Sequence, residues 1–151
     1  LIAPSGTVIL KLCYVDVAPG TDPEAVFAQY RQTVDSLRAP RPVLTIVHVT
    51  TPLTTDAGWL RHVAAGLRGL TSRRQGNYLF GRYNELLLET YGGRDPVFGL
   101  ARHDATDAKG RLSTVRVDGK SVPMLLGEWS SDGSHPNEAG RCRVAEAFRS
   151  L

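Results

Sequence analysis

Residues 7–17 read Thr-Val-Ile-Leu-Lys-Leu-Cys-Tyr-Val-Asp-Val, and this stretch decides the fold class of the 151-residue chain. It is rich in β-branched residues and almost continuously apolar. Strands that are covered on both faces of a sheet have this composition, because neither face meets water. We therefore predict a buried strand of a parallel sheet. Asp16, near the carboxyl end of the stretch, is the polar exception.

The next residues complete a strand–helix–strand unit. Residues 18–20 form a turn, and Thr21 with Glu24 forms a capping box that has Pro23 in the first helical turn. Residues 43–50 read as a second strand, so the two strands are predicted to be parallel and the crossover right-handed. The apolar face of the helix between them consists of Val26, Phe27, Tyr30, Val34 and Leu37.

The carboxyl ends of these strands are the expected place for a site. In open parallel sheets, ligands bind in the crevice beyond that edge. Asp16 and residues 50–53 fall there, and Asp16 is therefore a candidate substrate-binding residue. His48 lies inside the second strand, and we interpret it as a hydrogen-bonded core histidine and not as part of the site.

The remaining elements follow from shorter patterns. Residues 54–76 contain a short amphipathic helix with four arginines around it, which we interpret as a solvated face or lid, with an anion-binding patch as the sharper alternative. The other predicted elements are a helix over 77–91, a strand over 96–101, a hairpin of 112–117 with 121–125, and a last helix from 139 onward.

The segment before the last helix carries the clearest chemistry. It reads Ser-Asp-Gly-Ser-His-Pro-Asn-Glu-Ala-Gly over residues 131–140. Pro136 keeps His135 extended, and Gly133 permits a tight turn, so that the Asp132 carboxylate can reach one imidazole nitrogen. The other nitrogen could then accept a proton from a nucleophile. Asp132 and His135 are thus predicted as an orienting acid and a general base.

This segment resembles the last conserved block of the SGNH (GDSL-type) hydrolases. The resemblance rests on Asp132-x-x-His135 followed by Asn137, Gly140 and an amphipathic helix, together with weaker likenesses at 11–16, at 47–53 and at 82–84 that look like a bacterial branch of the superfamily. It implies one α/β domain over 1–151, three-layered α/β/α, with a mainly parallel flavodoxin-like sheet. It also implies a serine esterase that acts on an ester of a carbohydrate or small molecule without a cofactor.

Two departures from the family's pattern limit this expectation. The strand that ends in the serine nucleophile has no counterpart here, so the nucleophile is unidentified, and we expect a missing N-terminal segment to act as partner and the sheet edge to be frayed without it. The family's Gly-x-Asn-Asp block reads Cys-Tyr-Val-Asp over 13–16, and only Asp16 matches. A catalytically inactive binding or structural module is therefore the alternative function. Ser130, Ser131 and Ser134 are too close to His135 in sequence for good nucleophile geometry.

Composition excludes several other classes. The net charge is +3 with a pI of about 9.1, but no basic run or aromatic platform supports a nucleic-acid partner. No apolar stretch is long enough to span a membrane, and we expect no membrane partner.

Cys13 and Cys142 match no zinc or disulfide pattern, so no metal is expected. A flavodoxin-like nucleotide binder would need a Gly-rich phosphate loop, which is absent. The first residues show no signal peptide and no initiator Met, from which we expect a fragment or processed product; the compartment is not indicated.

Overall fold

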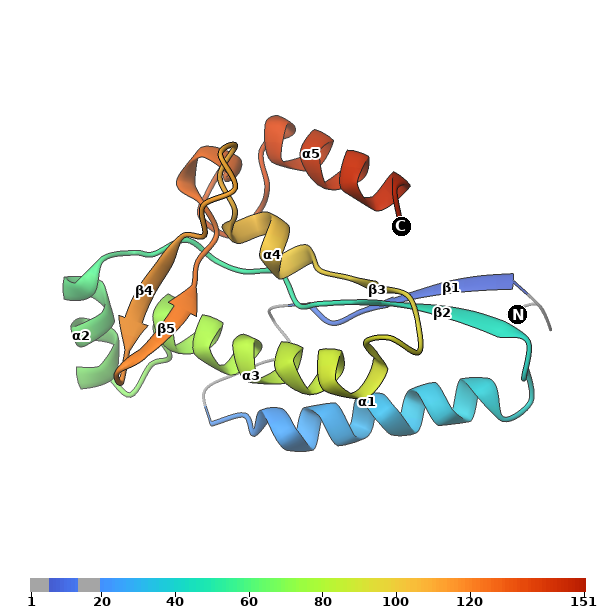
Figure 1. Cartoon of the computed structure of the whole chain (residues 1–151). Coiled ribbons are helices and arrows are strands. Elements are labelled where there is room, and N and C mark those ends of the chain that lie inside the picture. Colours follow the sequence, from blue (N-terminus) through green and yellow to red (C-terminus); the bar gives the residue numbers. More distant parts are fainter. Residues whose placement is uncertain (1–5, 14–19) are drawn as a thin grey trace.

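The structure, a computed structural model, describes residues 6–13 and 20–151 (Figure 1). Its main sheet has three parallel strands in the order β1 (Gly6–Lys11), β2 (Leu44–Val49) and β3 (Val97–Phe98). Helix α1 (Pro23–Arg38) connects the first two strands. The predicted strand–helix–strand unit is therefore confirmed, and the chain belongs to the α/β class.

Helix α1 begins one residue later than the capping box predicted. Asp22, and not Thr21, is the N-cap, because its side chain accepts a hydrogen bond of 3.0 Å from the backbone N–H of Glu24. Asp is as good an N-cap as Thr, and Pro23 then occupies the first helical position, where its missing N–H costs nothing.

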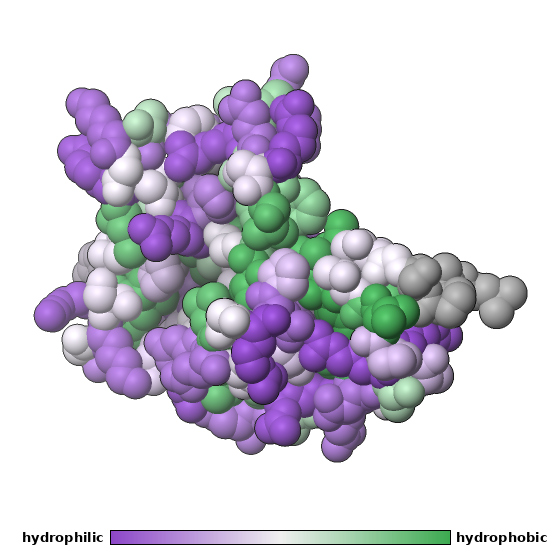
Figure 2. Space-filling model, turned by 45° about the vertical axis from the view of Figure 1, so that its right-hand side comes forward, coloured by the Kyte–Doolittle hydropathy of each residue, from purple (hydrophilic) through white to green (hydrophobic). Residues whose placement is uncertain are grey.

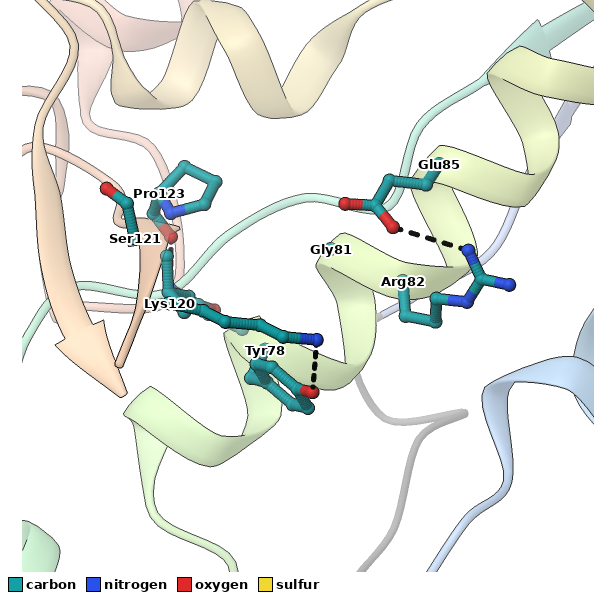
Figure 3. Close-up of a pocket in the computed structure, with 9 residues that line it drawn as sticks. Tyr78, Gly81, Arg82, Glu85, Lys120, Ser121 and Pro123 are labelled. Carbon is teal, nitrogen blue, oxygen red and sulfur yellow. Dashed lines mark hydrogen bonds and ion pairs between the residues drawn. The ribbon is translucent and has the colours of Figure 1, made fainter. Parts of the chain in front are cut away.

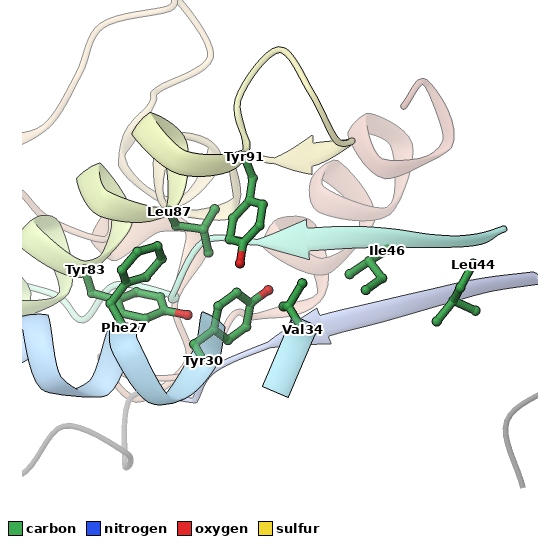
Figure 4. Close-up of a cluster of buried hydrophobic side chains, with 8 residues drawn as sticks. All are labelled: Phe27, Tyr30, Val34, Leu44, Ile46, Tyr83, Leu87 and Tyr91. Carbon is green, nitrogen blue, oxygen red and sulfur yellow. The ribbon is translucent and has the colours of Figure 1, made fainter. Parts of the chain in front are cut away.

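One face of the sheet packs on α1 and on α3 (Arg73–Tyr91), and this interface is the main core (Figure 4). Most of its aromatic pairs meet edge to face, for example Phe27 with Tyr83 at 5.9 Å between centroids, and Phe27 with Tyr30 is stacked. Burial of each large side chain contributes about 1.5–3 kcal/mol, so this cluster dominates the stability of the domain. The buried members are Phe27, Tyr30, Val34, Leu44, Ile46, Tyr83, Leu87 and Tyr91.

The other face of the sheet is only partly covered. Val47 and Val49 are buried there, and Phe98 packs edge to face on Phe148 of α5 (Glu138–Arg149) at 4.9 Å between centroids. Ile9, which is paired in register with Val47, is 55% exposed. The prediction that the first strand is covered on both faces is therefore wrong at Ile9, because β1 is the outer strand of the described sheet and α5 does not extend over it.

The smaller elements lie around the carboxyl edge of the sheet (Figure 1). The predicted hairpin is confirmed, and its turn places Asp118 and Gly119 at φ of 49° and 77°, as a tight two-residue hairpin turn requires. The predicted third strand is shorter than expected, because the chain turns into helix α4 at Leu100. The elements are α2 (Trp59–Leu67), α4 (Leu100–Ala105), β4 (Thr114–Val117), β5 (Lys120–Pro123) and the short 3-10 turn η2 (Gly127–Trp129).

Helix α3 begins earlier than the apolar pattern predicted. It starts at Arg73, four residues before Asn77, because the Ser72 hydroxyl accepts a hydrogen bond of 3.2 Å from the N–H of Gln75 and caps the helix. The added turn brings Arg73 toward the loop that precedes α5, and this contact matters for the site.

Candidate active site

The loop between η2 and α5 is closed by hydrogen bonds within itself. Ser131 N–H donates to the His135 carbonyl oxygen at 3.0 Å, and the Ser130 hydroxyl donates to the same oxygen at 3.0 Å. The Ser130 hydroxyl also accepts from the Gly133 N–H at 2.7 Å. Both serine side chains therefore hold the loop backbone, since the Ser131 hydroxyl also donates to the His135 carbonyl oxygen.

Asp132 and His135 are paired as their spacing predicted. One Asp132 oxygen accepts from the N–H groups of Ser134 and His135, each at 2.8 Å, and the other lies 2.7 Å from His135 Nδ1. The hydrogen bond to His135, followed by those two backbone N–H groups, holds the pKa of Asp132 well below its usual value. In the tautomer that donates from Nδ1 to this carboxylate, Nε2 carries the lone pair.

Arg73 and Thr55 fix this loop from outside. Arg73 donates to the Thr55 hydroxyl at 2.8 Å and to the Asp132 carbonyl oxygen at 3.2 Å, and Thr55 N–H donates to the Gly133 carbonyl oxygen at 2.8 Å. Gly133 has φ of 87°, and a Cβ there would overlap the Arg73 guanidinium and lie 2.7 Å from the Thr55 hydroxyl. Glycine is therefore needed at 133 for both conformation and space.

Gly140 sets the close approach of α5 to the same loop. Asn137 caps α5 by accepting a hydrogen bond of 2.9 Å from the Gly140 N–H. A Cβ on Gly140 would lie only 2.6 Å from the Trp129 carbonyl oxygen. The spacing of His135, Asn137 and Gly140 thus has a structural reason, because it lets α5 begin at Glu138, three residues after the histidine.

Two buried asparagines of α3 hold the segment that follows β2. Asn84 Oδ1 accepts from the Thr51 N–H at 2.7 Å. Asn77 Oδ1 accepts from the Thr54 N–H at 3.0 Å, and its amide nitrogen donates to the Thr54 carbonyl oxygen at 2.8 Å. Each asparagine therefore satisfies buried backbone groups that would otherwise be unpaired. Both roles depend on long-range contacts, for which the sequence contains no local signal.

A cavity of about 720 Å³ opens beside His135. It lies between α4, α5 and the end of β1, and Lys11, Asp104 and Arg141 supply polar groups to its wall. Figure 2 shows a recess with hydrophobic side chains gathered in it. Of the segment that follows β2, Pro52 and Leu53 line the cavity, and Thr50 and Thr51 do not. The apolar lining includes Pro52, Leu53, Leu100, Leu125, Val144 and Phe148.

Asp104 is a buried carboxyl group in the wall of this cavity that the sequence did not single out. Burial raises its pKa to about 6, although a hydrogen bond of 3.0 Å from the Leu53 N–H and the charge of Lys11 both oppose the rise. Asp104 follows His103 on a helix that the sequence pattern did not predict, so no signal could have identified it.

Two further residues singled out from the sequence are Asp16 and His48. Asp16 lies outside the described residues, so its place at the site stays a prediction. His48 is fully buried, as predicted: Nδ1 is 2.6 Å from the Tyr30 hydroxyl, and the ring stacks on Tyr91 at 3.9 Å between centroids. Burial lowers the pKa of His48, which favours the neutral ring of a structural histidine.

A second, much smaller cavity of about 90 Å³ lies between α3 and β5 (Figure 3). Its charged groups are paired: Lys120 donates to the Tyr78 hydroxyl at 3.1 Å, and Arg82 lies 3.4 Å from Glu85. A cavity of this size suits a few water molecules, and we assign no chemistry to it.

Within residues 6–13 and 20–151, no group of three or more His, Cys, Asp and Glu side chains is arranged to hold a metal ion. The described helices include none with the length and apolar character needed to cross a membrane.

Comparison with known proteins supports the fold class alone. No family model matches the chain, and no curated protein matches it. A solved structure from Streptococcus pneumonia, provisionally described as a platelet activating factor, superposes with a TM-score of 0.63 at 14% sequence identity. The match covers 95% of this chain but only 58% of that protein, so this chain spans little more than half of its structural neighbour.

Proposed function

We propose that this chain carries the acid–base part of an SGNH-type hydrolase that cleaves esters of a carbohydrate or small molecule. The observation that carries the proposal is the 2.7 Å contact between Asp132 and His135 Nδ1 at the rim of a largely apolar cavity of about 720 Å³. A carboxylate that orients a histidine base beside a substrate-sized cavity is the arrangement that acyl transfer requires.

The proposed reaction divides the work between two residues of this chain and a serine outside it. The serine hydroxyl oxygen attacks the acyl carbonyl carbon while His135 Nε2 takes its proton. Asp132 stabilises the imidazolium, which then protonates the leaving alcohol as the ester C–O bond breaks. Water then attacks the acyl group on the serine, His135 takes the proton of that water, and the serine leaves with the proton returned to it. The apolar lining would contact the non-polar part of the substrate.

The architecture supports the same family. Helices α1 and α3 cover one face of the sheet and α4 and α5 lie toward the other, which suits a three-layer flavodoxin-like arrangement once further strands pair with the outer edge of β1 (Figure 1). In this proposal, the segment that brings the serine occupies that edge. The structural neighbour's description names platelet activating factor, a phospholipid that carries an ester bond, and a ligand of that kind fits the proposed substrate class.

The test uses the protein as its natural source makes it, so that every segment is present. A fluorophosphonate probe should form one adduct, which peptide mapping places on a serine outside residues 1–151. The His135→Ala variant should lose at least ~99% of this labelling, because an unactivated serine is a weak nucleophile. His62→Ala is the matched control, since this histidine hydrogen-bonds Ser72 and is not among the residues that line the cavity, and it should label normally. Labelling that survives His135→Ala would refute the assignment.

A non-catalytic binding module is the second candidate. The observation in its favour is the cavity itself, whose apolar walls suit an uncharged ligand without any chemical step. This function would give no fluorophosphonate adduct on the full-length protein, together with saturable binding of an apolar ligand that Phe148→Trp, within the lining, weakens.

A further inference from the structure

Helix α2 is amphipathic, but its apolar face points away from the rest of the chain, unlike that of a helix that packs on a protein core. The side chains that approach the rest of the molecule are His62, whose Nδ1 is 2.6 Å from the Ser72 hydroxyl, and the small Ala65. No residue of α2 is fully buried. A surface helix of a globular domain ordinarily places its apolar stripe inward, so this orientation needs another explanation.

The apolar stripe of α2 faces solvent. Trp59, Leu60, Val63 and Leu67 recur at i, i+1, i+4 and i+8, which is one side of a helix. Trp59 is 61% exposed, Leu60 69% and Leu67 85%, and Leu70, just beyond the helix, is also exposed. These large apolar side chains, close together in sequence, form a patch of the kind that marks an interaction surface.

Positive charge borders this stripe. Arg61 and Arg68 are exposed and lie together along one flank of the helix, since they are two helical turns apart. The sequence contains no Asp or Glu between Asp56 and Glu85, so no acidic side chain of this segment offsets them. Asp56 itself is engaged by Arg74 at 2.7 Å. The patch is therefore apolar at its centre and cationic at its border.

We infer that α2 is a docking helix for an anionic lipid surface. A helix that lies in the interface inserts its apolar stripe between acyl chains, while flanking arginines meet lipid phosphates. Tryptophan at the start of such a helix suits the boundary between headgroups and hydrocarbon. A helix that lies in the interface does not need the length to span a membrane. The expectation of no membrane partner rested only on the lack of a spanning stretch, so it does not apply to this mode of binding.

The charge argues against a second copy of the chain as the occupant. Two α2 helices packed by their apolar stripes would place Arg61 and Arg68 of both copies around the border of one interface, with no acidic side chain of the segment to offset them. Like charges at a desolvating interface are costly, whereas lipid phosphates neutralise the same groups. The inference stands on α2 alone and does not depend on the hydrolase proposal.

The experiment is flotation of the whole chain with vesicles of phosphatidylcholine and phosphatidylglycerol in a ratio of about 3:1, roughly the charge density of an anionic membrane. Three double variants each lower the net charge by two: Leu60→Glu with Leu67→Glu, Arg61→Gln with Arg68→Gln, and Leu88→Glu with Leu112→Glu. The last pair is the control, because both leucines are exposed but lie outside α2. Tryptophan emission, measured in a Trp129→Phe background so that Trp59 is the one fluorophore, and gel filtration are recorded for each protein.

The wild-type chain should float with the anionic vesicles, with a blue shift of Trp59 emission, and bind phosphatidylcholine alone much less. The leucine pair in α2 should weaken partition at least ~10-fold and the arginine pair about five-fold per residue, while the control binds normally. Absence of flotation, or full binding by the α2 leucine variant, would overturn the inference. So would a wild-type dimer that this variant dissociates, because a second copy would then cover the helix.

Discussion

Replacement of Asp104 by Asn should stabilise the chain at pH 8 and not at pH 4. The pKa of Asp104 is raised by burial from 3.8 to about 6 in the folded state. The folded state therefore holds this proton more tightly than the unfolded state does. The bound proton of Asp104 therefore stabilises the folded state at low pH. This stabilisation is lost as pH rises from about 4 through 6, because the buried carboxylate must then carry its charge.

The size of the effect follows from the same shift. At about 1.36 kcal/mol per pH unit, a rise from 3.8 to about 6 is worth up to about 3 kcal/mol in the free energy of unfolding. The amide introduced by Asp104→Asn would keep an oxygen to accept the hydrogen bond that Leu53 N–H now donates at 3.0 Å. The variant should thus remove the cost of the charge without leaving the Leu53 N–H unpaired.

Urea unfolding of the wild-type chain and of each variant between about pH 2 and pH 8 measures this difference. Asp107→Asn is the control, because hydrogen bonds from Arg111 lower the pKa of Asp107. Its pH dependence should have the opposite sign: the variant is the less stable protein at pH 8, and the difference disappears as pH falls below about 4. If Asp104→Asn changes the free energy of unfolding by the same amount at every pH, the reasoning about burial is refuted.

Two substitutions test how the loop and its support are held. Gly133→Ala should lower the free energy of unfolding by about 2–4 kcal/mol, since it combines a positive φ with overlap of the added Cβ and the Arg73 guanidinium. Gly119→Ala is the control, because it has a similar φ but no atom within 4 Å of the added Cβ, and it should cost only about 1 kcal/mol in the same urea titration. Equal costs would show that space at 133 is not limiting. Asn77→Ala should cost about 2–4 kcal/mol by the same measurement, because the buried Thr54 N–H and carbonyl oxygen lose their partner; a cost below about 1 kcal/mol would mean that water replaces it.

The parts of the fold that the sequence predicted are those that local patterns control. The strand–helix–strand unit follows from apolar periodicity and turn residues that lie close together along the chain. The Asp132–His135 pair is equally local, because an Asx-type turn closes it. The hairpin followed from Asp118-Gly119 for the same reason.

The parts that were missed depend on contacts between distant segments. Arg73 reaches Asp132 across 59 residues, and nothing near Arg73 in the sequence indicates this contact. The burial of Asp104 depends on Leu53, which is 51 residues away. The exposure of Ile9 could not be predicted either, since β-branched residues look alike in edge and central strands.

The outer edge of β1 has a practical consequence for anyone who handles the chain. In the described sheet this strand pairs with β2 alone, and Ile9 stands exposed beside backbone groups that face away from β2. Such an edge is a template on which strands of other molecules can add, so concentrated solutions should be prone to aggregate. The substitution Ile9→Lys would place a gatekeeper charge against this self-association, and its effect on solubility would show how much of it starts at that edge.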